Sequence, residues 1–384
     1  MKIVVLGAGR VGSAIAADLA AEPGFEVTAV DHSAAALEGL RSGPVARTLE
    51  ADLADPARVR ALAGEHDLVV GAVPAHMGYR TVEAAIEAGR HVVDISFFEE
   101  DAFGLDALAR ARGVVAVMDA GVSPGLSNII LGYQEAVAER VSRYVCYVGG
   151  LPEDRGGLFQ YKAPFSPADV IEVYTRPARY KAGGQIRTDP ALSGVEEIEV
   201  PGVGTLEALL TDGLRTLLAD DAVPDMRELT LRYPGHADQM RLLREMGLFD
   251  TTPVELNGVS VVPRDLTTRL LFPLWEFGPS EADLTALRVE VDTVVAGKTV
   301  RHVYEMLDRY DRQTDTSSMA RTTGYTCTAI VHLVARGQYK HVGISPPEFV
   351  GRDIACFEQV VRYLDQRGVS ITHSTEAVEV KDAR

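Results

Sequence analysis

Cysteine is scarce in this chain of 384 residues, where only Cys146, Cys327 and Cys356 occur. The number is odd and no CxxC pair is present, so the sequence argues against a disulfide framework. The 9 histidines are scattered, and none of them forms an HxxxH or HExxH spacing. We therefore expect neither a zinc site nor any other metal centre.

Positive charge and long apolar runs are lacking as well. The 38 Lys and Arg residues face 55 Asp and Glu residues, which gives a formal net charge of −17. Nucleic acids and anionic lipid surfaces bind clustered Lys and Arg, so we expect neither as a partner. No apolar run reaches the ~20 residues that span a bilayer. Because the first residues, MKIVVLGAG, lead into a glycine turn and not into a signal cleavage site, we expect a cytoplasmic protein.

What the sequence does contain is a globular composition, with 46% hydrophobic and 24% charged residues, over a length that favours two domains. Residues 1–125 alternate between strand-like and helix-like segments. Such alternation predicts an α/β fold, a doubly wound parallel sheet of the Rossmann type. The predicted strands are 2–6, 26–30, 68–73, 91–95 and 114–118, and the predicted helices are 13–21, 79–88 and 103–112.

The pattern changes after Gly125, and residues 126–318 are predicted to form a second, α+β domain. A large sheet with one exposed face often becomes a subunit interface, so we expect a homo-oligomer, at least a dimer. Residues 319–384 are expected to return to the first domain, with helices at 320–335 and 353–367. In the second domain, strands of a sheet with one solvated face are predicted at 143–148, 196–200, 228–233 and 287–295, and helices at 206–218 and 238–246.

The most informative motif is GAGRVG, residues 7–12, which follows the first predicted strand and opens the first predicted helix. Gly7 permits a tight turn, Gly9 lets the backbone approach a pyrophosphate, and Gly12 allows close packing of the helix. The helix amino terminus then faces the diphosphate of a dinucleotide, with Arg10 and Val11 in the same turn.

Asp31 lies 19 residues after Gly12, at the end of the second predicted strand. A carboxylate at that place accepts hydrogen bonds from the adenosine ribose hydroxyls and repels a 2′-phosphate, so NAD is favoured over NADP. His32 and Arg10 are near enough in the sequence to soften that preference.

Three more residues belong to the predicted cofactor site. Asp52, after the expected third strand, is open between a contact on the adenine side and a helix N-cap. Val73 and Pro74 stand at the end of a predicted strand, where open α/β sheets bind their ligands. A glycine turn with an incidental aspartate is the plainer alternative for the whole motif.

Several sequence blocks together resemble the saccharopine dehydrogenase family. Besides GAGRVG, they are HVVDIS (91–96), MDAGVSPGLSNIILG (118–132), YVGGLP (147–152) and YKAPFSP (161–167). Within that family the chain most resembles bacterial L-lysine 6-dehydrogenases, through TLRYPGH (230–236), ELNGVSVVPRD (255–265) and MARTTGYT (319–326).

The resemblance implies a Rossmann domain, an inserted α+β domain for substrate binding and oligomerisation, and a closing carboxy-terminal segment. It also implies chemistry on an amine carbon. In lysine 6-dehydrogenases, hydride passes from the ε-carbon of lysine to NAD, the imine is hydrolysed to the semialdehyde, and the semialdehyde cyclises to piperideine-6-carboxylate. Saccharopine reductases carry an acidic residue in place of Ser123 and a tryptophan in place of Phe165, so the resemblance favours lysine or another small basic amino acid.

Oxidation of a lysine side chain, whose pKa is ~10.4, requires a group that takes up a proton. Asp119 and Asp94 each end a predicted strand at the ligand-binding edge of the sheet. His236 is a third candidate, as a base or proton shuttle, because histidine titrates near physiological pH. The plainer alternatives are a turn or cap for Asp119, ordering of the nicotinamide ribose or the adjoining loop for Asp94, and a structural role for His236.

The α-carboxylate of an amino acid calls for a cation, and aromatic rings can line its aliphatic chain. Each candidate has a plainer alternative: a surface charge for a cation, a core position for an aromatic residue. The predicted substrate-binding residues are Ser123, Lys162, Phe165, Arg215 and Arg321, with Tyr161 beside them.

Three functions stay open at this stage. The first is NAD-dependent oxidative deamination of L-lysine at its ε-amine. The second is condensation of an amine with a carbonyl and reduction of the imine, as saccharopine reductases and carboxyspermidine dehydrogenases perform it. The third is a dinucleotide-binding sensor without turnover, since a fold by itself never proves catalysis.

Overall fold

The computed structural model describes residues 1–41, 43–163, 167–278 and 280–378. The chain forms two compact units: unit 1 comprises Met1–Val137 and Met319–Ser370, and unit 2 comprises Ala138–Ser318 and the segment from Ile371 onward. Among the described residues, no helix combines the length and apolar character that crossing a bilayer requires.

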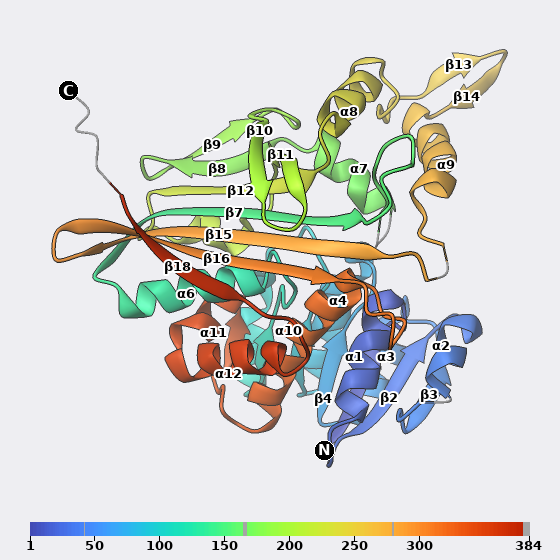
Figure 1. Ribbon diagram of the computed structural model, residues 1–384. Helices are drawn as coiled ribbons and strands as arrows, with labels where there is room; N and C mark the ends of the chain where they lie inside the picture. The colour runs from blue at the N-terminus through green and yellow to red at the C-terminus, as the bar shows by residue number, and fades with distance from the viewer. Residues whose placement is uncertain (42, 164–166, 279, 379–384) are drawn as a thin grey trace. The chain divides into compact units, whose positions relative to one another are not determined.

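Unit 1 is built on a sheet of seven parallel strands (Figure 1). The short β-branched runs are buried on both faces, with Ile3, Val4 and Val5 fully inaccessible, as expected for a parallel sheet covered by helices. The predicted α/β fold is confirmed. In spatial order the strands are β17 (Gly343–Ser345), β6 (Val115–Val117), β5 (His91–Asp94), β4 (Leu68–Gly71), β1 (Lys2–Leu6), β2 (Glu26–Asp31) and β3 (Arg47–Glu50).

Helices connect the strands of unit 1. The Asp55 carboxylate caps the first of the helices after β3 by accepting a hydrogen bond from Ala57 N at 2.9 Å, and Pro56 suits the first helical position. Asp353 caps the last helix in the same way, through two backbone N–H groups. The helices are α1 (Arg10–Ala20), α2 (Ala34–Arg41), α3 (Pro56–Gly64), α4 (Ala75–Glu87), η1 (Ala102–Leu105), α5 (Asp106–Arg112), α6 (Leu126–Val137), α10 (Ser318–Ala335), α11 (Pro347–Arg352) and α12 (Ile354–Asp365).

Asp18 ties α1 to two helices from the far end of the chain. Its Oδ2 accepts hydrogen bonds from Thr328 of α10 at 2.6 Å and from Tyr363 of α12 at 2.8 Å, and its Oδ1 accepts one from Arg367 at 2.7 Å. Burial, and then the negative charge of Asp18, raise the pKa of Tyr363. The carboxy-terminal helices are therefore bonded directly to the first helix of the Rossmann sheet.

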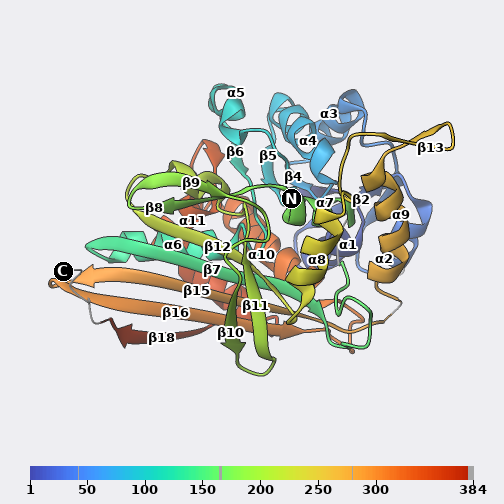
Figure 2. The same ribbon diagram turned by 90° about the horizontal axis from the view of Figure 1, so that it is seen from above.

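Unit 2 contains a nine-stranded sheet in which β7 and β12 are parallel and the other pairs are antiparallel. Figures 1 and 2 show β7, β15 and β16 as long strands side by side, with β18, from the end of the chain, along β16. The main path is β10 (Glu196–Val200), β11 (Gly204–Leu210), β12 (Asp225–Arg232), β7 (Arg140–Pro152), β15 (Asp283–Val295), β16 (Lys298–Arg309) and β18 (Thr372–Ala377), with β8 (Ala178–Ala182) on β12 and β9 (Gln185–Asp189) on β8.

The helices of unit 2 surround Trp275, which is fully buried together with Tyr174 and Met240. Helix α8 occupies the segment that the periodicity of 238–246 predicted, so that prediction is confirmed. The elements outside the large sheet are α7 (Pro167–Thr175), η2 (Arg215–Ala219), α8 (His236–Glu245), α9 (Pro263–Trp275) and the hairpin of β13 (Val254–Leu256) and β14 (Val259–Val261).

The helix predicted at 206–218 is wrong. Residues 204–210 form β11, which pairs with β10 on one side and β12 on the other, and a turn then leads to η2. Leu, Glu and Ala favour helices, but helix propensities differ by only ~0.7 kcal/mol per residue among ordinary amino acids. Pairing on both edges satisfies the backbone and buries Leu206 to Leu210, and this outweighs the local preference.

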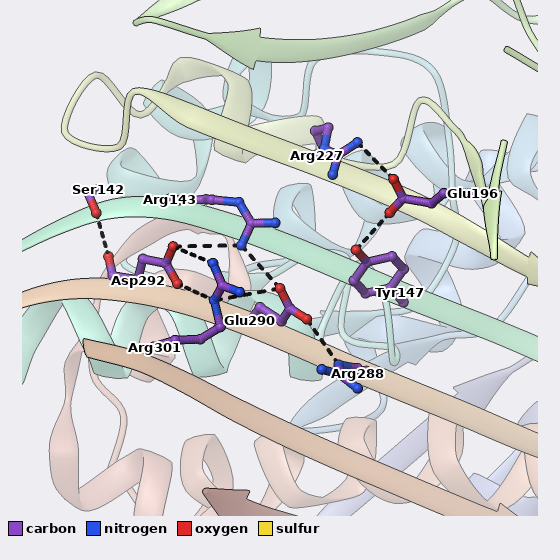
Figure 3. A network of polar contacts seen from close by, with 9 residues as sticks. All are labelled: Ser142, Arg143, Tyr147, Glu196, Arg227, Arg288, Glu290, Asp292 and Arg301. Carbon is purple, nitrogen blue, oxygen red and sulfur yellow. Dashed lines mark hydrogen bonds and ion pairs between the residues drawn. The ribbon is translucent and has the colours of Figure 1, made fainter. Parts of the chain in front are cut away.

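A network of charged side chains crosses β7, β15 and β16 (Figure 3). Both oxygens of Asp292 accept hydrogen bonds from Arg301, at 2.7 and 2.9 Å, and Arg143 lies 3.1 Å from Glu290. Asp292 and Glu290 are nevertheless only 5% and 7% exposed. The expectation of a solvated sheet face is therefore wrong for β15, because paired charges on neighbouring strands permit burial. The bond to Asp292 raises the pKa of Arg301.

Candidate functional site

The carboxyl ends of β1 and β4 mark the point in unit 1 where the strand order reverses. The chain runs from β1 to β2 and β3 on one side, and β4, β5 and β6 lie on the other. Open α/β sheets bind their ligands at such a switch point. A Cβ at Gly7 would lie 2.3 Å from the carbonyl oxygen of Ala72, which follows β4. The turn after β1 is therefore packed directly on the turn after β4.

The glycines of this turn leave room where a ligand needs it. Gly7 has a φ of +104°, and a Cβ at Gly12 would lie 2.1 Å from the carbonyl oxygen of Gly7, so neither position accepts a side chain. A Cβ at Gly9 would meet no atom within 4 Å. The N-cap of α1 is Gly9, which has no side chain to bond the first N–H groups of the helix. This open side of the turn fits the diphosphate of a dinucleotide.

Asp31 ends β2 and holds the turn. Its Oδ2 accepts a hydrogen bond from Ala8 N at 2.7 Å, and its Oδ1 accepts one from Ser33 N at 2.8 Å. Each carboxylate oxygen keeps a second lone pair, so Asp31 can also accept hydrogen bonds from ribose hydroxyls. The residues present therefore fit a nicotinamide dinucleotide.

The other residues predicted around this turn lie in unit 1 as well. Arg10 and Val11 begin α1, with Arg10 exposed. His32 Nδ1 lies 3.2 Å from Asp31 Oδ1 on a side chain that is 84% exposed. Val73 is buried after β4, and Pro74 is the N-cap of α4.

Asp52 is exposed after β3, where its Oδ1 accepts a hydrogen bond from Ala54 N at 2.9 Å. The helix cap that was an alternative for Asp52 is supplied by Asp55. Leu53 and Ala54, next in the chain, line a groove of about 330 Å³ with residues of α4, among them His76.

Asp94 ends β5 and is fully buried. Its Oδ1 accepts a hydrogen bond from Ser96 N at 2.7 Å, and Ser96 Oγ lies 3.1 Å from the carbonyl oxygen of Val73. A Cβ at Gly71 would lie 1.8 Å from Asp94 Oδ2, so the carboxylate fills space that only glycine leaves on β4. Asp94 thus connects the loop after β5 to the loop after β4.

Asp119 follows β6 and is only 3% exposed. Its φ of +54° lies in the left-handed region, which Asp and Asn adopt more readily than most residues. Ala120 N donates to the carbonyl oxygen of Asp94 at 2.9 Å, so the two aspartates stand at adjacent strand ends. Ser123 lies farther along the same loop, with its Oγ 3.1 Å from Ser127 Oγ.

Arg321 lies on α10 of unit 1 and is 8% exposed. Its Nη2 donates to the carbonyl oxygen of Arg367 at 3.0 Å, and its guanidinium carbon lies 5.5 Å from the Tyr325 ring centroid. At least one of its N–H groups therefore binds the backbone just after α12.

The remaining predicted substrate residues belong to unit 2. Lys162 Nζ lies 2.5 Å from Glu281 Oε2, so a carboxylate of its own unit balances its charge. Arg215 begins η2 with a φ of +47°. Phe165 lies outside the described residues.

His236 begins α8 in unit 2 and is 2% exposed. Its Nδ1 lies 3.1 Å from the carbonyl oxygen of Phe159 and therefore carries the proton, which leaves Nε2 to accept a hydrogen bond from Tyr174 at 2.8 Å. Burial, and then the charge of Arg232, lower the pKa of His236 to about 3. A role as a base would require the bond to Tyr174 to break.

Arg232, the last residue of β12, was missed by the sequence analysis. It is 4% exposed, its guanidinium carbon lies 4.3 Å from the Tyr161 ring centroid, and its Nε donates to Tyr174 Oη at 3.2 Å. Within the described part of the chain, Arg232 forms no ion pair with a carboxylate. A buried cation of this kind is suited to an anionic group of a ligand. The available signal was an arginine at a strand end, directly before the Tyr-Pro-Gly turn of TLRYPGH.

Glu207, the acidic residue that acts on Arg232 electrostatically, has another task. Its carboxylate accepts hydrogen bonds from the backbone N of Gly235, at 2.9 Å, and of Ala237. Glu207, on β11, thereby caps the amino terminus of α8. The two hydrogen bonds also fix the turn that joins Arg232 to His236.

No group of three or more His, Cys, Asp and Glu side chains that could hold a metal ion occurs in the described ranges. The three cysteines are buried and form no disulfide there. Burial raises the pKa of the Cys327 and Cys356 thiols, so both are held in the protonated form.

Two family models match the chain. The model described as saccharopine dehydrogenase NADP binding domain matches residues 3–117, and the model described as saccharopine dehydrogenase C-terminal domain matches residues 121–369. The second match covers more than half of the chain, and the resemblance to the saccharopine dehydrogenase family is confirmed.

Two relatives share about a fifth to a quarter of their aligned residues with this chain. The chain is 24% identical over 263 residues to a saccharopine dehydrogenase (NADP+, L-glutamate-forming) of Saccharomyces cerevisiae, a match that covers 64% of this chain and 58% of that protein. It is 20% identical over 365 residues to the carboxyaminopropylagmatine dehydrogenase of Synechocystis sp., a match that covers 89% and 91%. The chain thus spans little more than half of the yeast protein.

Among solved structures, the apo saccharopine dehydrogenase (L-Glu forming) of Saccharomyces cerevisiae matches with a TM-score of 0.80. The match covers 98% of this chain and 100% of that chain at 19% sequence identity. At that identity the likeness establishes the fold.

Proposed function

Since this chain belongs to the saccharopine dehydrogenase family, we propose that it is an oxidoreductase that uses a nicotinamide dinucleotide to oxidise a small basic amino acid at an amine carbon. The proposed reaction is deamination of L-lysine at its ε-carbon, which yields the semialdehyde and, by cyclisation, piperideine-6-carboxylate. The observation that carries the proposal is the glycine turn at the strand switch point, closed by Asp31.

When bound, the dinucleotide supplies the hydride acceptor. Gly7 and Gly12 keep side chains out of the turn, and Asp31 would receive the ribose hydroxyls. We propose NAD as the cofactor, because a 2′-phosphate at this place would meet the Asp31 carboxylate. The name of the matching family model points to NADP instead, so the preference must be measured directly.

The amine end of the substrate needs a proton acceptor, because a lysine ammonium with a pKa of ~10.4 is nearly always protonated at neutral pH. We assign this role to Asp119. Asp94 is already bonded through Oδ1 to Ser96 and connects two loops, which suits a positioning role. The carboxylate that takes up the ammonium proton could also hold the water that hydrolyses the imine.

Within unit 2, taken by itself, one side chain has the chemistry to bind a carboxylate. The Arg232 guanidinium is planar, buried and stacked on Tyr161, and planar bidentate pairing with carboxylates is the geometry that arginine favours. Lys162, the cation expected from the sequence, is already paired with Glu281. Arg232 is therefore the better candidate.

The deciding experiment is a spectrophotometric assay of NADH formation. Purified protein would be supplied with NAD or NADP and with lysine, ornithine or arginine at mildly alkaline pH, where more amine is neutral. Lysine-dependent NADH and a product that gives the colour reaction of a cyclic imine would support the proposal. NADPH formation alone would overturn the cofactor assignment, and silence with all amines would overturn the oxidative reaction.

A second candidate is reductive: condensation of an amine with a carbonyl compound and reduction of the imine. It is favoured by the match with the carboxyaminopropylagmatine dehydrogenase, which extends over nearly the whole of both chains. Consumption of NADH or NADPH only when an amine and a carbonyl compound are both present would identify this reaction.

A further inference from the structure

Glu348, near the start of α11, reaches the loop after β6 through one intervening side chain. We propose that Glu348 is a positioning residue for residues 119–125, acting through Asn128 of α6. The kinetic part of this inference rests on the proposed function, because the loop carries Asp119 and Ser123. The structural part, the placement of the loop, stands by itself.

The contacts fix the orientation of Asn128. Its Nδ2 donates to Glu348 Oε2 at 3.1 Å. Its Oδ1 then accepts hydrogen bonds from Gly125 N at 3.2 Å and from Ser127 Oγ at 3.1 Å. Because the Gly125 N–H can only donate, the amide oxygen of Asn128 points to the loop and its NH2 group points to Glu348, whose Oε2 accepts.

Of the two hydrogen bonds that Asn128 Oδ1 accepts, the one from Ser127 connects it to Ser123. Ser127 Oγ lies 3.1 Å from Ser123 Oγ as well as 3.1 Å from Asn128 Oδ1. A hydroxyl has one proton, so the bond to Asn128 determines what Ser127 can offer to Ser123.

The backbones of α6 and α11 are in direct contact, which leaves Glu348 little freedom. A Cβ at Gly132 would lie 2.0 Å from the carbonyl oxygen of Glu348. A Cβ at Gly351 would lie 2.0 Å from the carbonyl oxygen of Ile129. Two glycines, one on each helix, therefore let the two backbones touch, and this contact places residue 348 beside α6.

The loop itself is compact. Gly125 has a φ of +137°, and a Cβ there would lie 1.8 Å from the carbonyl oxygen of Gly121. Leu126 N donates to the same carbonyl at 2.9 Å. The Asn128 bond to Gly125 N thus anchors the end of a loop that begins at Asp119, and a shift at one end is passed to the other.

Burial makes the bridge strong. Glu348, Asn128 and Ser127 are 3%, 2% and 0% exposed, so water does not compete for these bonds. Loss of one partner would leave a buried polar group without a hydrogen bond, which is energetically costly. We therefore expect the loop to move so that the group finds another partner.

The experiment is a pair of substitutions and their combination. Asn128→Asp places a carboxylate against Glu348 and should displace the loop. Glu348→Gln is mild, because Gln can still accept from Asn128. The double variant restores the bridge in reverse, with the amide of residue 348 donating to the carboxylate of residue 128. Glu135→Gln is the matched control, because Glu135 also joins α6 to α11, through Arg352 at 3.0 Å, but on the exposed side.

Hydrogen exchange of the amides in 119–127 and the binding of NAD are measured first, since neither needs turnover. We expect faster exchange in Asn128→Asp, near wild-type exchange in the double variant and in Glu135→Gln, and NAD affinity within about twofold throughout. Unchanged exchange in Asn128→Asp, or no recovery in the double variant, would overturn the positioning role even if the wild type had no amine activity.

Where the wild type turns over an amine, the same variants are assayed for kcat and KM. A misplacement of about 1 Å at a reacting group can cost about 100-fold in rate, so we expect kcat of Asn128→Asp to fall by at least about tenfold and to recover in the double variant. A lower melting temperature with kcat and KM unchanged would show that the bridge only stabilises the fold.

Discussion

The carboxylate of Asp31, at the end of β2, accepts a hydrogen bond from the backbone N of Ala8 at 2.7 Å. The side chain that we propose to bind the ribose therefore also stabilises the glycine turn. Asp31→Asn would set an amide NH2 against one of the two N–H donors, Ala8 or Ser33. Hydrogen bonds to charged groups contribute about 1.5–3 kcal/mol, so we expect NAD affinity to fall at least about 10-fold by isothermal titration calorimetry. Glu50→Gln, on an exposed carboxylate at the end of β3, should bind NAD as the wild type does. Equal affinity for both variants would contradict the role of Asp31.

Asp119→Asn removes the proposed proton acceptor with little strain, because Asn tolerates the φ of +54° as well as Asp does. General acid–base groups contribute about 10²–10⁴-fold, so kcat for lysine should fall by that order while NAD affinity is retained. Steady-state kinetics and NAD titration measure the two quantities. Turnover at the wild-type level would reduce Asp119 to a turn residue.

Arg232→Lys keeps the charge but loses the planar stack on Tyr161 and the bond to Tyr174. We expect KM for lysine to rise about 10-fold, about 1.4 kcal/mol, with kcat near the wild-type value. Cadaverine, which has no carboxylate, should be used equally by both proteins. Arg227→Lys, on the same strand but in a half-exposed pair with Glu196, is the control. A similar loss with cadaverine would argue against carboxylate binding.

His236 predicts a pH dependence of stability. Its folded pKa of about 3 lies below the ordinary 6.5, so the unfolded chain binds the extra proton between these values. The neutral His236 side chain makes its full contribution to the free energy of unfolding above pH 6.5. This contribution is lost as the pH falls toward 3, at about 1.4 kcal/mol per pH unit. His236→Asn should therefore weaken the fall in unfolding free energy between pH 7 and pH 5 by about 2 kcal/mol, measured by urea titration.

Glu228 predicts the opposite trend. This buried carboxyl group of β12 has its pKa raised to about 7, chiefly by burial, so the folded chain holds a proton that the unfolded chain has already released. Stability is lost as pH rises from 4.5 to 7. Glu228→Gln should gain up to about 3 kcal/mol at pH 8 relative to the wild type and little at pH 4.5. Parallel curves for the two proteins between these pH values would show that Glu228 is ionised in the folded chain.

Local sequence patterns were sufficient to predict secondary structure where each residue's environment depends on its near neighbours in the chain. The β-branched runs of β1, β2 and β5, the turn 7–12 and the capped helix after Asp353 are of this kind. The segment 206–218 is the counterexample, because its state as β11 depends on β10 and β12. Strand pairing is satisfied by distant segments, so composition alone could not identify it.

By itself, the amino-acid sequence determined the Rossmann sheet, the glycine turn with Asp31, and the resemblance to the family, because these follow from hydrophobic period and from residues at fixed spacing. Only the tertiary structure decided how the chemistry-bearing side chains are partnered. It buried His236 between Tyr174 and Phe159, paired Lys162 with Glu281, left Arg232 stacked on Tyr161, and brought Glu348 to Asn128 across 220 residues of chain. The physical reason is that burial and hydrogen-bond partners, which set the charge and availability of a group, come from segments far apart in the sequence.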